Sequence, residues 1–451
     1  MEKYPERRRE AQRLSGRRSV PQIFFNQRHI GGYDDLQKLH IEGKLEELLR
    51  EVAETEVPPG APSPPPISDE DSVIWEFFDA QTCEGTECEG CIPDDLATLV
   101  TEIQDSGLIG LHVYHLVPYR NCLVGRELVD WLVNVKHCSR EEAVSIGTQL
   151  YDRHFLHHVT FEHNFKDDHY FYRLLGDIKA PALNAHLSHT CVPRPGTEVA
   201  EDLRRCILEI YDGHLAADGS GVDYEGIRTS NKFEAYVRST AELKRLDIHI
   251  FTREESLAFF INIYNVMVIH AFVAEGPPTS VWRRYKFFNN TSYVVGGLVF
   301  SLNDIENGVL RANRRAVGAW GRPFGRTDPR LKVSLVEHEP RIHFALVCGA
   351  KSCPPIRTYT AANIDEELTL TSEAFLEGDG CMVDMSRREV ALSMILKWYS
   401  VDFGSNPQEV LQWVCAHLPN SQKKVDLGKL LADNNYRIRY LPYNWDLNSL
   451  H

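Results

Sequence analysis

The clearest alternation of hydrophobic and polar positions lies in the middle of the chain. The segment GRELVDWLVNV repeats its apolar residues at helical spacing, and the next segment opens with Ser139 and two acidic residues, as a capped helix does. The stretch closes on YFYRLL, which favours a strand. This order of helices followed by a β-wing predicts a winged-helix module over residues 101–178.

A second pattern begins after this module and continues to the end of the chain. Residues 198–451 contain no linker-like composition, so we expect one domain here. Three helical patterns come first, and the third, REESLAFFINIYNVMVIHAFV, is strongly apolar yet contains Asn262, Asn265 and His270. Because buried amides are costly without partners, these side chains should brace neighbouring backbone or a site.

Strand patterns follow the helices in this domain. NTSYVVGGLVFSLNDIENGVLR predicts two short strands about Gly296–Gly297, then a helix capped by Asn303 or Asp304. The apolar residues from Ile342 to Val347 predict another strand. Helices first and strands later, without βαβ alternation, indicate an α+β domain.

The beginning of the chain is different in character. Residues 1–56 predict a short basic helix, a strand at Val20–Phe25, a tight turn and a helix from Asp34 to about Val52. The run PPGAPSPPP then marks a linker over residues 57–100. The linker also holds Cys83, Cys88 and Cys91, but a structural zinc site needs four ligands, so we interpret this segment as an acidic surface loop.

The charged residues are distributed unevenly in one segment of the chain. The chain has 49 Lys and Arg against 64 Asp and Glu, and residues 51–110 hold fifteen of the acidic residues and no basic ones. The rest of the chain is therefore balanced. The N-terminus is too charged for a signal peptide, and no apolar run reaches the length of about eighteen residues that a membrane span needs. We expect a cytoplasmic protein whose cysteines are mostly thiols.

The phrase SVPQIFFNQRHIGGYDDLQKL resembles the second half of glutaredoxins. The resemblance implies a partial thioredoxin-like unit and glutathione contacts at Val20, Pro21, Gly32, Tyr33 and Asp34. No cysteine precedes Cys83, so the thiolate that attacks a disulfide in this family is missing. We therefore expect no glutaredoxin activity, a vestigial glutathione site, and no other cofactor.

The phrases YRNCLVGRELVDWLVNV, EEAVSIGTQLYDRHFLHHV and FKDDHYFYRLL resemble a DEP domain over the whole central module. The resemblance implies an interaction module of intracellular signalling that contacts protein partners or an acidic membrane surface. Between His112 and Leu175 seven Lys and Arg face eight Asp and Glu. Duplex binding needs uncompensated cations, so we expect no nucleic-acid partner.

Five phrases of the C-terminal region resemble domain of unknown function 547: AFFINIYNVMVIHAF, YVVGGLVFSLNDIENGVLR, DPRLKVSLVEHEPRIHFALVCGAKSCPPIR, KWYSVDFG and YLPYNWDLN. The resemblance covers nearly all of residues 198–451 and implies a fold and the location of a site, without a reaction. Many members have a histidine where this chain has Asn307. Asparagine cannot act as a base near neutral pH.

The candidate chemistry centres on RIHFALVCGAKSCPPIR. In a regular strand His343 and Cys348 would lie about 16 Å apart on opposite faces, at about 3.3 Å per residue. Cys353 follows the Gly349–Ala350 turn, and we therefore favour it over Cys348 as a nucleophile. The base would be His343 or His270, and the residue that orients it Asn262 or Glu306.

Two alternatives stay open at this stage. The set His338, His343, Cys348 and Cys353 has the ligand types of a zinc-stabilised site, and a disulfide across the two cysteines is disfavoured in the cytoplasm. The leading interpretation is a signalling and interaction protein, peripheral at membranes, with a Cys/His pocket of unassigned activity. The alternative function is a Cys-dependent hydrolase or transferase that acts on acyl or isopeptide bonds.

Overall fold

The computed structural model describes residues Ile23–Phe25, Arg28–Gly31 and single positions between 39 and 48, then residues 92–445 except 115–116, 178–180, 217–221, 279, 351–356 and 358. The chain divides into two compact units, Met1–Asp79 and Ala80–His451. In the first unit β1 (Ile23–Phe25) pairs antiparallel with β2 (Arg28–Gly31), which confirms the strand end at Phe25. The other expectations for the first unit and for the linker cysteines lie outside the described residues.

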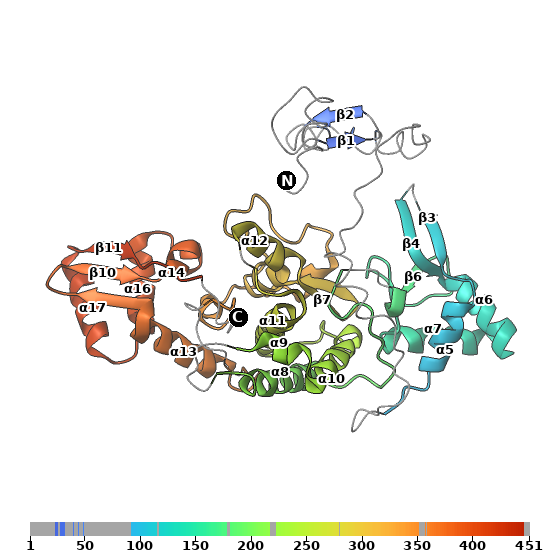
Figure 1. Ribbon diagram of the computed structural model, residues 1–451. Helices are drawn as coiled ribbons and strands as arrows, with labels where there is room; N and C mark the ends of the chain where they lie inside the picture. Colours follow the sequence, from blue (N-terminus) through green and yellow to red (C-terminus); the bar gives the residue numbers. More distant parts are fainter. Residues whose placement is uncertain are drawn as a thin grey trace. The chain divides into compact units, whose positions relative to one another are not determined.

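The central module of the second unit combines helices with one antiparallel sheet (Figure 1). The predicted helices are confirmed as α6 (Gly125–Lys136) and α7 (Arg140–Asp152), and Ser139 forms a capping box with Glu142. The sheet has the strand order β3-β4-β6-β5. Its strands are β3 (Gly110–Tyr114), β4 (Val117–Val124), β5 (Leu156–His158) and β6 (Phe171–Leu174).

Helix α5 (Ala97–Asp105) begins ahead of the expected boundary at residue 101. Leu99 and Ile103 of this helix join the hydrophobic core of the module together with Leu128 and Leu132. The packed module therefore includes the end of the segment that composition alone assigned to the linker.

A buried ion pair joins the central module to the C-terminal region. Arg245 donates from Nη2 to Asp94 Oδ2 at 2.7 Å, and both side chains are at most 3% exposed. Arg245 also donates to the carbonyl oxygens of Arg153 and Cys191 and lies over the ring of Phe155. These contacts fix the two parts of this unit to each other. Cys191 itself is disulfide-bonded, whereas six other cysteines of the described chain are thiols, in agreement with the expectation for most of them.

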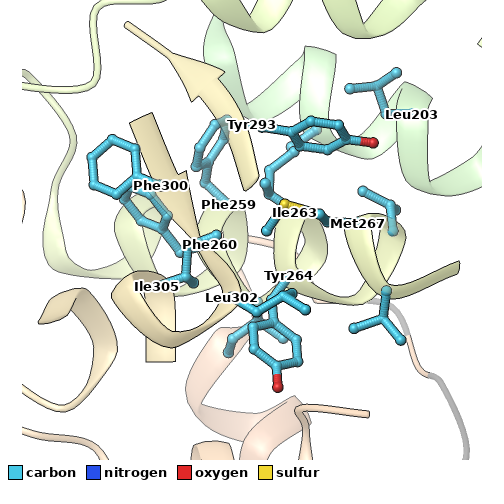
Figure 2. Close-up of a cluster of buried hydrophobic side chains, with 14 of the residues drawn as sticks. Leu203, Phe259, Phe260, Ile263, Tyr264, Met267, Tyr293, Phe300, Leu302 and Ile305 are labelled. Carbon is cyan, nitrogen blue, oxygen red and sulfur yellow. The ribbon is translucent and has the colours of Figure 1, made fainter. Parts of the chain in front are cut away.

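The C-terminal region opens with the three predicted helices, which are confirmed as α8 (Gly196–Asp212), α10 (Asn231–Ser239) and α11 (Arg253–Glu275). The sequence patterns did not predict α9 (Tyr224–Arg228) and α12 (Val281–Asn290). Helix α11 is buried on every side from Ser256 to Val273. Figure 2 shows Phe259, Ile263 and Met267 of α11 packed against side chains from β7 and β8. By length and composition α11 could cross a membrane, contrary to the sequence expectation, but 94% of its apolar window is buried, as in a core helix.

The diglycine hairpin is confirmed. Strands β7 (Ser292–Val295) and β8 (Leu298–Ser301) pair antiparallel, and Gly296 and Gly297 both have a positive φ, which glycine adopts without strain. A short π-helix, η3 (Asp304–Leu310), follows with Asn303 at its N-cap position. Asp304 instead accepts hydrogen bonds from the backbone and hydroxyl of Ser301.

The strand predicted from Ile342 to Val347 is wrong. Residues Pro340–Phe344 form a 3₁₀ helix, η5, and Ala345 continues it in a helical conformation. Proline fixes the backbone at the first position of this helix, and the Glu339 carboxylate accepts from the Arg341 amide at its start. The alternation of faces that separated His343 from Cys348 therefore does not apply.

A second hydrophobic core forms after α13 (Ile364–Phe375). It contains β9 (Cys381–Asp384), β10 (Glu389–Leu392) and β11 (Arg437–Tyr440), in the sheet order β11-β10-β9. The helices are α14 (Met394–Trp398), α15 (Ser400–Phe403), α16 (Pro407–His417) and α17 (Gln422–Asp433). Phe344 of η5 is buried in this core, whereas its neighbours Ile342 and Ala345 are buried in the core around α11. The η5 segment therefore connects the two cores of the C-terminal region.

Replacing Asp94 with Asn should lower the free energy of unfolding by about 3–5 kcal/mol, because Arg245 keeps its burial and loses its counter-charge. The matched control is Asp433→Asn, which removes an exposed pair with Arg388 and should cost less than about 1 kcal/mol. Urea unfolding of the full chain measures both. Equal losses in the two variants would contradict the assignment.

The same pair predicts a pH dependence. Burial raises the pKa of Asp94, but hydrogen bonds from Arg245 and Arg153 outweigh it, so the pKa lies below its ordinary value. This contribution to stability is present above the unfolded pKa of about 3.9 and is lost as the pH falls below it. The Asp94→Asn variant should lose less stability than the parent between pH 5 and pH 3, each value being about one unit from that pKa.

Candidate functional site

The carboxylate of Asp402, on α15, is the centre of a buried polar cluster. Arg311 donates to it from Nε at 2.5 Å and from Nη2 at 2.9 Å, and the Asp402 side chain has no exposed surface. Arg314 donates to the same carboxylate, and His338 Nε2 lies 3.1 Å from the Asp402 backbone oxygen. Burial raises the pKa of Asp402, but hydrogen bonds from His343 and Arg311 outweigh it and hold the pKa well below its usual range.

His343 is oriented by this carboxylate. Its Nε2 lies 2.8 Å from Asp402 Oδ2, and because an ionised carboxylate only accepts, Nε2 must carry the proton. Burial lowers the pKa of His343 despite the neighbouring carboxylates, so the ring is neutral near pH 7 with a lone pair on Nδ1. An imidazole that is held by a carboxylate through one nitrogen can accept a proton through the other.

Tyr399 and Cys348 lie beside this pair. The Tyr399 ring stacks on His343 with centroids 3.8 Å apart, and Glu306 lies near enough to influence its hydroxyl. Burial, followed by the charge of Glu306, raises the pKa of Tyr399 well above its ordinary value, and Cys348 adds to this effect. Cys348 Sγ lies 3.4 Å from the Tyr443 hydroxyl. One cluster therefore contains five side chains from four segments of the chain: Glu306, His343, Cys348, Tyr399 and Tyr443.

Glu306 contributes an unusual feature to the cluster. Within the described part of the chain its buried Oε1 atom has no hydrogen-bond partner. A buried carboxylate oxygen without a partner is costly, so such an atom is a candidate contact for a ligand or a reacting group.

Asn265 positions the backbone that leads to Cys348. Its Nδ2 donates to the Ala345 oxygen at 3.0 Å, and its Oδ1 accepts from the Val347 amide at 2.9 Å. Gly349 then turns the chain with φ 76°, and a Cβ there would lie 2.1 Å from Phe272. The prediction that polar residues of α11 brace neighbouring backbone is confirmed here.

The structure distributes the other predicted site residues between different places. Asn262 donates to the Tyr359 oxygen at 2.7 Å. His270 Nδ1 lies 2.7 Å from the Tyr293 hydroxyl, and burial lowers the pKa of His270 to about 3. His270 therefore belongs to a separate polar network. Cys353, the favoured nucleophile, lies outside the described residues.

The weak metal alternative gains no support from these contacts. His338 Nε2 and His343 Nε2 are both directed at Asp402, one at its backbone oxygen and one at its carboxylate. Among the residues that the structure describes, no group of three or more His, Cys, Asp or Glu side chains is arranged to hold a metal ion.

Sequence reasoning missed Asp402, Tyr399 and Arg311 as parts of the site. The available signal was the phrase KWYSVDFG, in which one carboxylate stands among apolar residues. Asn307, noted as a departure from its relatives, accepts from Arg311 Nη1 at 2.5 Å and donates to Asn303. It therefore fixes the arginine that neutralises Asp402.

Comparison with known families gives two matches in the second unit. The family model for the domain found in Dishevelled, Egl-10 and Pleckstrin (DEP) matches residues 108–174. The model for "Protein of unknown function, DUF547" matches residues 248–376, which include Glu306, His343 and Cys348 but neither Tyr399 nor Asp402. The chain is thus a multidomain protein of mixed helices and strands that contains a DEP domain and a DUF547 segment.

Individual relatives match short stretches. The phosphatidylinositol 3,4,5-trisphosphate-dependent Rac exchanger 1 protein of Mus musculus is 42% identical over 65 residues, 14% of this chain and 4% of the relative. The vacuolar membrane-associated protein IML1 of Eremothecium gossypii is 43% identical over 63 residues, with the same two shares. These relatives and the DEP domain fit a signalling or membrane-associated role.

A glutaredoxin of Neisseria meningitidis is 56% identical over 45 residues, which are 10% of this chain and 53% of the relative. This match agrees with a partial glutaredoxin-like unit. The chain therefore resembles a fusion of such a unit with a DEP domain and a DUF547 domain. It spans about half of the glutaredoxin and only 4% of the Rac exchanger and of IML1.

Replacing Asn265 with Leu should lower the free energy of unfolding by about 2–5 kcal/mol, because the Ala345 oxygen and the Val347 amide stay buried without a partner. Met267→Leu on the same buried helix conserves volume and should cost less than about 1.5 kcal/mol. Urea unfolding compares the two variants. A loss in Asn265→Leu no larger than that of the control would rule out the bracing role.

Proposed function

We propose that this protein is a cytoplasmic signalling protein that its DEP domain, a winged-helix module, recruits to a membrane surface. One observation carries the proposal. Leu111, Val113 and Tyr114 of β3 are 61%, 57% and 54% exposed, although all three are large and apolar. Exposed apolar residues gathered on one hairpin are typical of an interaction surface.

The position of the hairpin supports this role. Strands β3 and β4 extend beyond the helices of the module (Figure 1), and the core of the module is complete without the outer ends of these strands. Arg120 is exposed on β4, and Arg173 of β6 donates to the Arg120 oxygen, so cations accompany the apolar hairpin. Apolar side chains with nearby cations suit an acidic lipid surface. The similarity to IML1, a vacuolar membrane-associated protein, agrees with this choice.

The double substitution Leu111→Asp and Val113→Asp should weaken binding of the full chain to phosphatidylserine-containing vesicles about tenfold, because it removes apolar area and adds negative charge. Val135→Asp on α6 is the matched control, since Val135 is also exposed and lies in the same domain. Vesicle co-sedimentation measures both variants. If the hairpin variant binds as the control does, the hairpin is not the membrane contact. If the hairpin binds a protein and does not bind vesicles, its partner is a protein.

A second candidate function is thiol-dependent chemistry in the C-terminal domain, on an acyl or isopeptide bond. It is favoured by the His343–Asp402 pair, which leaves Nδ1 as a base, and by the unpartnered Oε1 atom of Glu306 in the same cluster. Cys348 is the described thiol at this cluster. In the proposed reaction a thiolate would attack the carbonyl carbon after a base takes the thiol proton. The bond to the amine or alcohol would then break, that group would leave with the proton, and water or an acceptor would release the acyl group from the cysteine.

Iodoacetamide at neutral pH should then label Cys348 or Cys353 in the folded chain faster than a thiol in the unfolded chain, because an activated cysteine is partly thiolate. Cys381 and Cys415 serve as internal controls: burial raises the pKa of Cys381 to about 11 and also raises that of Cys415. Peptide mass spectrometry gives the rate at each site. Labelling of both candidate thiols at or below the unfolded rate would end the enzyme hypothesis.

A further inference from the structure

Helix α12 presents large apolar side chains to solvent. Val281, Trp282 and Tyr285 are 80%, 76% and 63% exposed, and the rings of Trp282 and Tyr285 meet edge to face. The helix is well formed: the Ser280 hydroxyl caps it by accepting from the Arg283 amide, and Phe287 anchors its inner face in the core. An exposed tryptophan beside an exposed tyrosine is costly in water unless something covers them.

The charges of the helix surround this apolar surface. At helical spacing Val281, Trp282 and Tyr285 occupy one outward arc, and Lys286 and Arg283 border it on one side. Arg284 lies on the other side, where its guanidinium stacks 3.9 Å above the ring of Trp445. The ten residues of α12 include three cations and no acidic residue. Within the described residues no ion pair joins Arg283 or Lys286 to a carboxylate.

This arrangement selects one kind of partner. Aromatic side chains at the centre and cations at the border match the boundary between headgroups and acyl chains, where tryptophan and tyrosine concentrate. The chain carries a net charge of −15, so attraction to an anionic surface must come from a local basic patch. Such a patch acts over about one Debye length, roughly 8–10 Å at physiological salt.

We propose that α12 is a second membrane contact, in which Trp282, Tyr285 and Val281 enter the headgroup region of an anionic bilayer while Arg283 and Lys286 bind its lipid phosphates and carboxylates. This inference rests on the proposed membrane recruitment and extends it from the DEP domain to the C-terminal region. Two weak contacts on one chain give a stronger combined attachment than either contact alone.

The test uses the full chain and vesicles of phosphatidylcholine with or without phosphatidylserine, separated by sedimentation. Two variants change α12: Trp282→Ser with Tyr285→Ser, and Arg283→Glu with Lys286→Glu. The matched control is Val425→Ser with Lys429→Glu on α17, another exposed apolar and basic pair. Each variant is also made in the Leu111→Asp, Val113→Asp background, and thermal unfolding checks that all variants are folded.

Each α12 variant should reduce binding to phosphatidylserine vesicles about tenfold, and the control should stay within about twofold of the parent. In the hairpin background the residual binding should be lost when α12 is changed. If the α12 variants bind as the parent does while the hairpin variant fails, the inference falls and the DEP proposal stands. If instead the hairpin variant binds as the parent does while the α12 variants fail, α12 is the membrane contact and the hairpin is not.

Two further outcomes would overturn the inference. Binding that does not depend on phosphatidylserine would contradict the role of the cations. Sedimentation velocity without vesicles tests whether a second copy of the chain covers this surface instead. If the parent is a dimer and the Trp282→Ser, Tyr285→Ser variant is a monomer, α12 serves self-association and not membrane binding.

Discussion

The C-terminal region depends on one buried carboxylate. Asp402 accepts from Arg311 of the π-helix segment and from His343 of η5, so it ties elements that are 91 and 59 residues away in sequence. A buried charge of this kind is stable only when its partners stay in place, which makes the relative position of these segments specific. The order of the candidate site follows from that requirement, because Asp402 fixes which nitrogen of His343 carries the proton and Tyr399 stacks on the His343 ring.

Buried polar groups also hold neighbouring segments together elsewhere in the second unit. Helix α11 is apolar on all sides, yet Asn265 clamps the backbone before Cys348. At the other end, Arg245 and Asp94 join the DEP domain to the C-terminal region. These polar contacts account for the specificity of the arrangement, while the hydrophobic cores supply most of the stabilising free energy. The apolar residues of β3 and α12 differ from these groups, because more than half of the surface of each exposed side chain faces solvent.

Local patterns predicted the parts that local physics decides. Helical periodicity identified α6, α7 and α11, and the Ser139 capping box was visible in the sequence. The run around His343 was misread because its apolar residues have strand-like composition, whereas Pro340 and the distant side chain of Asn265 impose a helical turn. Of the candidate site, Glu306, His343 and Cys348 were predicted. Asp402 was missed: its carboxylate among apolar residues was a signal for a buried charge, but nothing local links it to His343.

A double-mutant cycle on Asp402→Asn and Arg311→Met tests the central claim, that this buried pair organises the C-terminal region. Each single variant leaves one buried group without its partner and should lower the free energy of unfolding by about 3–5 kcal/mol. The double variant should recover at least about 1 kcal/mol of the summed loss, because the two residues act as one unit. Strictly additive losses, or single losses below about 1 kcal/mol as at an exposed pair, would contradict the account.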